Sequence, residues 1–425
     1  MTLRDIYYFT KLWRNPKKSV KDIKKYQVKK LKEVVHHAYQ NSPFYHRKFK
    51  NAGVTPSDIH TLDDISKIPY TTKEELRQAG PDVLARNIPL DRCYSSMTSG
   101  TSGKKLDMYH SFTFRSFCVA IFYRMFIEWG VKPFKTVTYI RYTPIDYSHA
   151  KLGMITSHHI SSFLDVEKQM DALCHQNPDI LVAHPPDLVA LAQIAQKLDT
   201  CITFDFIGSN SELLTQKERD FIEKTFECPV YNEYSSLEVG YMARDCTLKH
   251  MHIISDSAFL EIVKDGEQVN PGERGEVVAT SLCLDVTPFI RYRHRDVASF
   301  SDEQCECGIN FPLMQIIEGR QDQFIVLPSG KEIPPTRIVP LFFGMKSVKD
   351  FAVVQTSKKN IVVEVVPYNS GLHQKDKEDI HEKIQKALPG MDIEIDTVLS
   401  IEKTERGKKR TVSNLVGKQK GGTII

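Results

Sequence analysis

Apolar positions recur at helical spacing in the first part of the chain. Between residues 28 and 38 they lie three or four residues apart, which predicts helices within residues 17–50. Thr72 followed by Glu75 has the spacing of a capping box and predicts a helix start. The long apolar stretch Phe112–Trp129 predicts a further helix, whose aromatic residues are expected in the core.

Short apolar runs alternate with amphipathic segments between residues 179 and 234. The runs predict strands at 179–184, 204–209 and 229–234, and the segments predict helices at 187–198 and 215–226. Strand–helix–strand alternation indicates a parallel α/β sheet. Ligands of such sheets bind at the carboxyl ends of the strands, so residues just after these runs are candidates for a binding site.

The pattern becomes β-rich between residues 250 and 300, and a small α+β unit follows Gly319. In that unit, strands are expected near 324, 350–354, 361–366 and 393–395, and helices near 335 and over 375–388. The sequence therefore predicts an α/β fold. Its large N-terminal domain, residues 1–320, would hold parallel α/β sheets and a β-rich subdomain, and residues 321–425 would form a small α+β domain.

The composition is that of an ordinary globular protein. Of 425 residues, 41% are hydrophobic and 26% are charged, and the net charge of +4 is too small to indicate a nucleic-acid partner. No stretch approaches the ~20 apolar residues needed to cross a bilayer, so membrane insertion is not expected. Met1–Trp13 lacks the apolar run of a secretory signal, and the nine cysteines follow no disulfide framework. A cytoplasmic protein is therefore expected, and its oligomeric state stays open.

A cluster of hydroxyl residues, glycines and lysines follows the predicted helix at Thr72. It consists of Thr98, Ser99, Gly100, Thr101, Ser102, Gly103 and Lys104, followed by Lys105. Small residues let a backbone turn point its N–H groups at a phosphate, and the hydroxyls and a lysine add donors and charge. The spacing differs from that of the Walker phosphate loop, which has Ser or Thr after its lysine. A flexible surface turn is the alternative interpretation.

Four further motifs follow this loop in a fixed order. They are Tyr234-Ser235-Ser236-Leu237-Glu238, Arg291 to Asp296, Gly319-Arg320-Gln321-Asp322 and Gly407-Lys408. Together with the loop, the series resembles that of the adenylate-forming enzymes, the acyl-CoA synthetase superfamily. Within that superfamily the chain is most similar to the phenylacetate–CoA ligase branch, which includes capsule-associated relatives. The resemblance covers nearly the whole chain.

The resemblance implies ATP-dependent activation of a carboxylic acid as an acyl-adenylate, with release of pyrophosphate. It implies that the loop 98–104 holds the phosphates, that Tyr234 packs on adenine and that Asp296 accepts hydrogen bonds from the ribose. Arg320 is expected near the ribose and phosphate. The remaining residues expected around the nucleotide are Ser211, Glu212, Ser235 and Ser236.

Two residues are implied directly in catalysis. Glu238 would hold Mg²⁺, an ion that takes oxygen ligands, and Lys408 would reach the carboxylate and the α-phosphate. Lys408 lies in a basic run, for which a solvated surface is the alternative interpretation. Asp322 matches the hinge of the family, so the small domain is expected to be mobile. The acid pocket is expected near Tyr123 and the segment 209–212.

Several positions depart from the family pattern, among them His294, where Thr is common, and Lys105, where Pro is common. Ser235 stands where Gly is usual, Leu237 where Ser or Thr is usual, and Arg295 where Gly is common. One hypothesis is an acid–CoA ligase that acts on an aryl or related small acid and transfers the acyl group to CoA. A second is an amide synthetase that passes the acyl group to an amine in polysaccharide or secondary-metabolite biosynthesis. The departures motivate a third, a nucleotide-binding homologue that has lost catalysis.

A second group of residues has the chemistry of a metal site. Cys305 and Cys307 form a tight knuckle, and Cys246 and His252 occupy positions that the phenylacetate–CoA ligase branch also fills with Cys and His. Three thiolates and one imidazole make a closed tetrahedral set, which predicts structural Zn²⁺. Free surface cysteines beside unrelated residues are the alternative, and His250 could substitute for His252.

Overall fold

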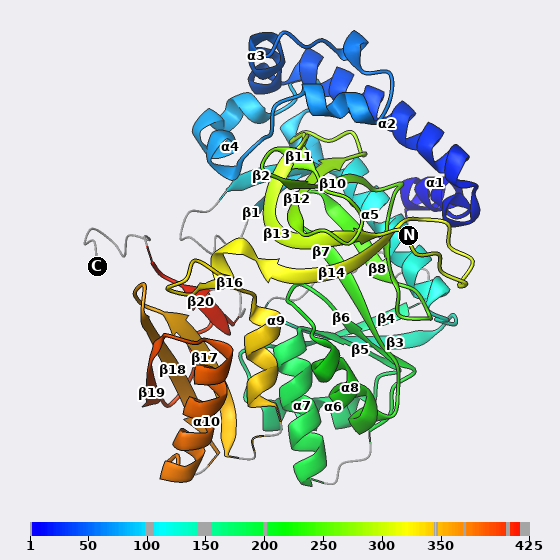
Figure 1. The fold of residues 1–425 in the computed structure, drawn as a ribbon. Helices are drawn as coiled ribbons and strands as arrows, with labels where there is room; N and C mark the ends of the chain where they lie inside the picture. Colours follow the sequence, from blue (N-terminus) through cyan, green and yellow to red (C-terminus); the bar gives the residue numbers. More distant parts are fainter. Residues whose placement is uncertain are drawn as a thin grey trace.

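A twelve-stranded mixed sheet runs through the larger part of the molecule (Figure 1). The computed structural model describes residues 2–97, 106–142, 155–198, 202–343, 345, 347–368, 371–404 and 409–416. The strand order is β11-β10-β12-β13-β14-β9-β8-β7-β6-β5-β3-β4. Neighbouring strands are parallel from β4 to β7 and antiparallel from β7 to β11. The two kinds of pairing therefore meet at β7.

The parallel half contains the strands and helices that the alternating pattern predicted. Its strands are β3 (Lys135–Arg141), β4 (Ile155–Ser161), β5 (Ile180–Ala183), β6 (Phe206–Ser209) and β7 (Val230–Ser236). Its helices are α6 (Val166–Gln176), α7 (Pro185–Leu198) and α8 (Gln216–Phe226). The predictions for β5 to β7, α7 and α8 are confirmed, whereas β3, β4 and α6 had not been predicted.

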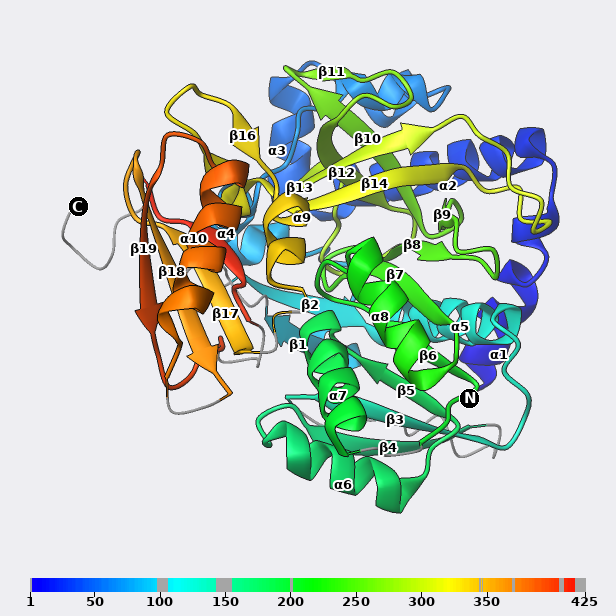
Figure 2. The same cartoon turned by 60° about the horizontal axis from the view of Figure 1, so that its bottom comes forward.

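Helices cover both faces of this parallel half. Ile180 and Val182 of β5 pack with α5, whereas Leu181 and Ala183 pack in a second cluster with α6, α7 and α8. Alternate side chains of a strand point to opposite faces, so both faces of β5 are apolar and both are covered. Figure 2 shows α6, α7 and α8 gathered on one side of the strands.

The β-rich segment continues the same sheet and does not form a separate one. Its strands are β8 (Gly240–Asp245), β9 (Met251–Ile253), β10 (Ala258–Lys264), β11 (Glu267–Gln268), β12 (Gly275–Ser281), β13 (Tyr292–Ser301) and β14 (Leu313–Arg320). Because β14 lies between β13 and β9, the sheet joins segments far apart in the sequence. The expected α/β fold class is confirmed.

The N-terminal region packs against both halves of the sheet. It contains α1 (Leu3–Leu12), α2 (Val20–Asn41), α3 (Pro43–Asn51), α4 (Lys73–Ala79), the hairpin β1 (Cys93–Met97) and β2 (Asp107–Ser111), and α5 (Phe112–Glu128). Thr72 and Glu75 form the predicted capping box at the start of α4. Thr71, just before it, bridges to Tyr292 of β13 and so fixes α4 beside that strand.

The C-terminal segment has a core cluster of its own, which includes Val353, Val363 and Ile384. Its elements are β15 (Ile325–Val326), β16 (Glu332–Ile333), α9 (Pro335–Ile338), β17 (Val348–Gln355), β18 (Asn360–Pro367), α10 (Gln374–Ala387), β19 (Asp392–Thr397) and β20 (Val412–Asn414). The strand order of its main sheet is β19-β18-β17-β20. A domain boundary between residues 320 and 321 stays a prediction. In the part of the chain that the structure describes, no helix is long and apolar enough to span a membrane.

Candidate active site

A cleft of about 1450 Å³ lies against β7, where the parallel and antiparallel halves of the sheet meet. Its walls include residues of α4, the β1–β2 hairpin, α5, β7, β13 and β14. The segment 409–412 of the C-terminal region also lines it. The cleft is therefore built from segments that span most of the sequence.

The cleft collects most of the predicted site residues that the structure describes. Those that line it are Ser211, Glu212, Tyr234, Ser235, Ser236, Glu238, Asp296 and Arg320. Of the residues predicted around the nucleotide and in catalysis, Thr98, Ser99, Gly100, Thr101, Ser102, Gly103, Lys104 and Lys408 lie outside the described residues. Ser96 and Lys409, which are close to them in the sequence, line the cleft. The roles of all these residues stay predictions.

Tyr234, Asp296 and Arg320 form a connected polar group across three strands. Tyr234 Oη donates a hydrogen bond of 2.6 Å to Asp296 Oδ2. Asp296 is the register partner of Arg320 in the β13–β14 pair, and Arg320 Nε donates to Asp322 Oδ1 at 3.1 Å. Burial, together with the Asp296 carboxylate, raises the pKa of Tyr234 well above its usual value, so the hydroxyl stays protonated. An aromatic face, a carboxylate and a guanidinium thus lie together, which are groups of the kinds that can contact a base, a ribose and a phosphate.

Glu238 lies just beyond the end of β7, and Tyr292 Oη donates a hydrogen bond of 3.3 Å to its Oε1. Lys73, in the first turn of α4, also lines the cleft. Burial lowers the pKa of Lys73, and the Glu238 carboxylate opposes that shift. Nothing in the sequence marks Lys73 except its place after the capping residue Thr72.

Polar residues connect the carboxyl ends of four parallel strands, and of these only Asn210 lies in a segment expected at the acid pocket. Arg141 ends β3, and its guanidinium donates to His184 Nε2 at 2.7 Å and to Asn210 Oδ1 at 2.6 Å. Asn210 Nδ2 in turn donates to Glu233 Oε1 at 3.2 Å. His184 follows β5, Asn210 follows β6 and Glu233 is in β7. Their shared position at strand ends is the signal that could have identified them.

The four predicted zinc ligands come together in the structure. One ligand atom from each of Cys246, His252, Cys305 and Cys307 lies within 4.8 Å of the other three. Cys246 Sγ and Cys305 Sγ are 3.7 Å apart, and Cys307 Sγ is 3.3 Å from His252 Nε2. His252 Nδ1 lies 2.8 Å from the carbonyl oxygen of Phe311. That contact requires a proton on Nδ1 and leaves Nε2 to face the thiols, as expected of a metal-binding histidine.

The chain is similar over most of its length to proteins of known name, although no family model matches it. It is 28% identical to the phenylacetate-coenzyme A ligase of Escherichia coli over 343 residues, which cover 75% of this chain and 76% of that protein. The chain is a homologue of the phenylacetate–CoA ligases. Protein CapK of Staphylococcus aureus is 24% identical to this ligase homologue over 422 residues, 92% of this chain and 89% of that protein. The resemblance drawn from the motifs is confirmed.

The fold of this ligase homologue is also that of a solved CoA ligase. A crystal structure of 2-hydroxyisobutyryl-CoA ligase in the postadenylation state superposes with a TM-score of 0.81 at 20% identity. The superposition covers 94% of this chain and 91% of that one. Because the identity is low, this likeness establishes the fold alone.

Arg295, which stands where Gly is common in the family, has a backbone conformation that is unfavourable for a residue with a side chain. Its φ of 62° lies in the left-handed region, which glycine adopts freely and other residues adopt at roughly 1–2 kcal/mol. Arg295 N donates to Glu276 Oε1 at 3.2 Å, a contact that helps to hold this backbone. Ser235 Oγ donates to Glu233 Oε1 at 3.1 Å, so its hydroxyl is used within β7. Leu237 is exposed.

Tyr123, near which the acid pocket is expected, does not line the cleft, although other residues of its helix do. Tyr123 is buried in the core cluster with α1 and α5, whereas Phe114 and Cys118 of the same helix line the cleft. Nine residues separate Phe114 from Tyr123, which is two and a half helical turns, so the two side chains point to opposite faces of α5.

Proposed function

We propose that this homologue is an AMP-forming acid–CoA ligase that activates an aryl or related small carboxylic acid. The observation that carries the proposal is the cleft, in which Tyr234, Glu238, Asp296 and Arg320 meet although they come from three separate motifs. Homologues named phenylacetate-coenzyme A ligase agree with this enzyme class. The proposed reaction uses ATP and CoA, which are cytoplasmic metabolites, and therefore also agrees with a cytoplasmic protein.

In the first half-reaction, a carboxylate oxygen of the acid attacks the α-phosphorus of ATP. The bond from the α-phosphorus to the bridging oxygen breaks, and pyrophosphate leaves with the electron pair. Tyr234 would pack on the adenine, Asp296 would accept hydrogen bonds from the ribose hydroxyls, and Arg320 would lie beside the ribose and phosphate. The loop 98–104 would hold the phosphates with backbone N–H groups, and Lys408 would bridge the two reacting anions. Fixing both anions in contact is the main task of the protein in such a step.

The residues present fit the two metal ions that we propose. Glu238 would hold Mg²⁺, because its carboxylate lines the cleft and offers a hard oxygen ligand. The ion would supply positive charge to the leaving pyrophosphate. Cys246, His252, Cys305 and Cys307 would hold Zn²⁺ in a closed site, since the 3.7 Å separation of two sulfurs is the edge of a tetrahedron with Zn–S bonds of ~2.3 Å. That site would be structural.

In the second half-reaction, the CoA thiolate would attack the carbonyl carbon of the acyl-adenylate and AMP would leave. We propose that the small domain, residues 321–425, turns about Asp322 between the two steps and withdraws Lys408. The domains 1–320 and 321–425 would then share one active site. An amine in place of CoA would make the protein an amide synthetase with the same first half-reaction.

The experiment that tests the proposal is ATP–pyrophosphate exchange with Mg²⁺ across a panel of aryl, fatty, hydroxy and amino acids. Exchange that depends on one acid would establish adenylation. AMP release would then be measured with CoA and with amines, and release that depends on CoA would support the ligase. Release that depends on an amine would favour the amide synthetase. ATP binding without exchange for any acid would favour the non-catalytic alternative, which the departures at Ser235, Leu237 and Arg295 motivate.

A further inference from the structure

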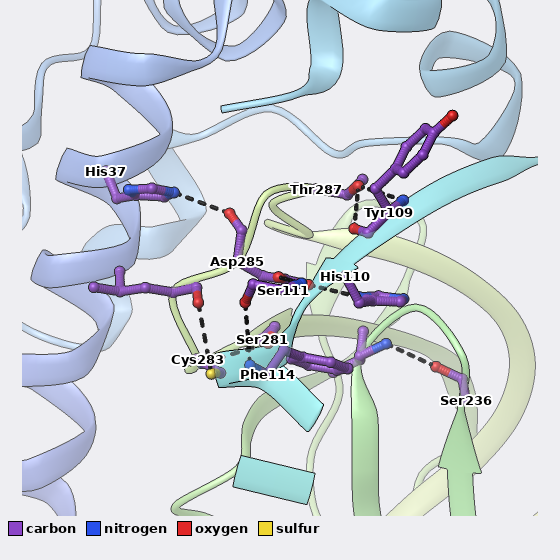
Figure 3. A network of polar contacts seen from close by, with 12 residues as sticks. His37, Tyr109, His110, Ser111, Phe114, Ser236, Ser281, Cys283, Asp285 and Thr287 are labelled. Atoms are coloured by element: carbon purple, nitrogen blue, oxygen red, sulfur yellow. Dashed lines mark hydrogen bonds and ion pairs between the residues drawn. The ribbon is translucent and has the colours of Figure 1, made fainter. Parts of the chain in front are cut away.

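His110, one of the residues that line the cleft, forms a buried pair with Asp285 (Figure 3). His110, the last residue but one of β2, has 2% of its surface exposed, and its Nδ1 is 2.5 Å from Asp285 Oδ2. Asp285 comes from the loop between β12 and β13 and is equally buried. Its other oxygen, Oδ1, accepts a hydrogen bond of 2.7 Å from Ser111 N at the start of α5. The Asp285 carboxylate is therefore held between two donors.

The position of Asp285 is itself fixed by neighbouring contacts. His37 Nε2 lies 2.9 Å from the Asp285 carbonyl oxygen. Two residues on, Thr287 Oγ1 accepts from Tyr109 N at 3.1 Å and donates to the Tyr109 carbonyl at 2.7 Å. The loop that carries Asp285 is thus attached to both α2 and β2, as Figure 3 shows.

This arrangement selects one tautomer of a neutral His110. Because a carboxylate only accepts hydrogen bonds, the proton must lie on Nδ1, and Nε2 is left as an acceptor. Nε2 is buried and has no hydrogen-bond partner among the residues that the structure describes. Ser96 Oγ is in the same situation, and both residues line the cleft. A buried acceptor without a donor is unfavourable, and a ligand that brings a donor would remove that cost.

Aromatic side chains surround His110 where it lines the cleft. Tyr94 is the register partner of His110, and the His110 ring stacks on Phe114 with centroids 4.5 Å apart. Phe114 and Cys118 in turn pack closely against Gly240. A Cβ atom added to this glycine would lie only 3.3 Å from the Phe114 ring and 3.1 Å from Cys118 Sγ. Gly240 is two residues after Glu238, so this part of the cleft adjoins the proposed reaction centre. It is built by β1, β2 and α5, whereas the proposed nucleotide contacts come from β7, β13 and β14. The acyl group is therefore the part of the substrate that fits here.

We propose that His110 selects acids that carry a hydrogen-bond donor, a hydroxyl or an amino group, on the acyl chain. The inference rests on the proposed function and narrows its substrate class. His110 Nε2 accepts the hydrogen bond from the acid, and Asp285 is the positioning residue that holds the proton of the neutral ring on Nδ1. Sites built to pair with a substrate hydroxyl reject analogues that lack it, because the buried protein group is then left without a partner.

The test compares matched acids in pyrophosphate exchange at pH 8. Each set shares one carbon skeleton and carries hydrogen, a hydroxyl, an amino group or an oxo group at one position. The wild-type protein should use the hydroxy or amino member of at least one set with a kcat/KM about ten times or more that of the hydrogen member. His110→Phe keeps a ring to stack on Phe114 but removes the acceptor. In this variant the ratio should fall to about one, while exchange with the hydrogen member persists. Cys118→Ala, in the same part of the cleft, should keep the wild-type ratio.

Asp285→Asn tests the tautomer directly. Ser111 N would bind the amide oxygen, so the amide NH₂ would donate to His110 Nδ1 and the ring proton would move to Nε2. Nε2 would then be a donor. The preference in kcat/KM should therefore shift from the hydroxy or amino member of each set towards the oxo member, which offers only an acceptor. A purely structural role would instead lower exchange equally for all members. If this variant does not fold, His110→Phe still decides the question.

The outcomes separate this inference from the function on which it rests. Exchange by the wild-type protein without preference for a donor in any set would overturn the inference alone. An unchanged ratio in His110→Phe would do the same. No exchange with any acid, by folded protein that binds ATP, would overturn the proposed function and the inference with it.

Discussion

Tyr234 and Asp296 are joined by a hydrogen bond of 2.6 Å, although 62 residues separate them in the sequence. The bond connects β7, where the two halves of the sheet meet, to β13, which carries the Arg291–Asp296 motif. One carboxylate oxygen of Asp296 is thus occupied by the tyrosine, and the carboxylate is held in a fixed orientation. The proposed adenine and ribose contacts are therefore coupled through the protein.

Tyr234→Phe should weaken ATP binding without abolishing it. The ring that would pack on adenine remains, but Asp296 loses the donor that orients it, which costs about 1–1.5 kcal/mol and raises the KM for ATP about five- to tenfold. Pyrophosphate exchange at varied ATP concentration measures the change. Asp296→Asn and the double variant complete a mutant cycle. Strictly additive effects of the two substitutions would show that the hydrogen bond does not couple the two contacts.

The purified protein should contain one zinc ion per chain. Cys305→Ser should lose the metal and lower the unfolding temperature, because a structural zinc site contributes directly to folding free energy. Metal analysis and thermal unfolding check both effects. Cys174→Ser changes an exposed cysteine outside the cluster and is the matched control. His250 Nδ1 is 3.1 Å from Cys305 Sγ but lies outside the four-residue cluster, so His250→Ala should retain zinc. Full zinc content in Cys305→Ser would refute the ligand set.

Lys408→Ala should slow adenylation by about 10²–10³, a typical loss when one charge-stabilising group is removed from a transition state. ATP binding should change little, because the proposed contact forms with the reacting carboxylate and α-phosphate. Lys409→Ala is the neighbouring control, since Lys409 forms an ion pair with Asp350 in the C-terminal region. Single-turnover formation of acyl-adenylate distinguishes the two variants. A larger effect at Lys409 than at Lys408 would mean that the wrong lysine was chosen.

Glu233→Gln should stabilise the protein more at neutral pH than at about pH 4. Burial raises the pKa of Glu233, so the folded state binds its proton more tightly than the unfolded state does. The wild-type carboxyl therefore lowers the free energy of unfolding as pH rises above about 4.3, by up to about 1.4 kcal/mol per pH unit until the folded state also ionises. Glutamine keeps an oxygen for Asn210 and Ser235 but does not titrate. Denaturant unfolding of both proteins across this pH range gives the difference in their free energies of unfolding. If that difference does not vary with pH, the pKa of Glu233 is not raised in the folded protein.

Short motifs and strong periodicity could be predicted from the sequence, but long-range pairs could not. Tyr234, Glu238 and Arg320 were found because each lies in a local pattern that resembles a family motif. His110 and Asp285 are 175 residues apart and carry no local signal, so only the fold reveals their contact. The left-handed backbone of Arg295 is likewise invisible in the sequence.

The position of Tyr123 could not be predicted for a different reason. Helix α5 carries apolar residues around most of its circumference, because one face packs in the core and another lines the cleft. The distribution of apolar residues around the helix therefore does not indicate which side faces the cleft. The strands β3 and β4 were missed, although Thr136–Ile140 of β3 includes a run of β-branched residues bounded by charged ones.

The strand order of the large sheet also has a consequence for synthesis on the ribosome. β14 pairs with β9 on one side and β13 on the other, yet β9 ends at Ile253 and β14 begins at Leu313. At ~5–20 residues per second, several seconds pass between the two, and during that time one edge of β9 has no partner. Cys305 and Cys307 emerge just before the missing strand. The nascent chain thus exposes an open strand edge until β14 has been made, and such an edge can pair with other chains.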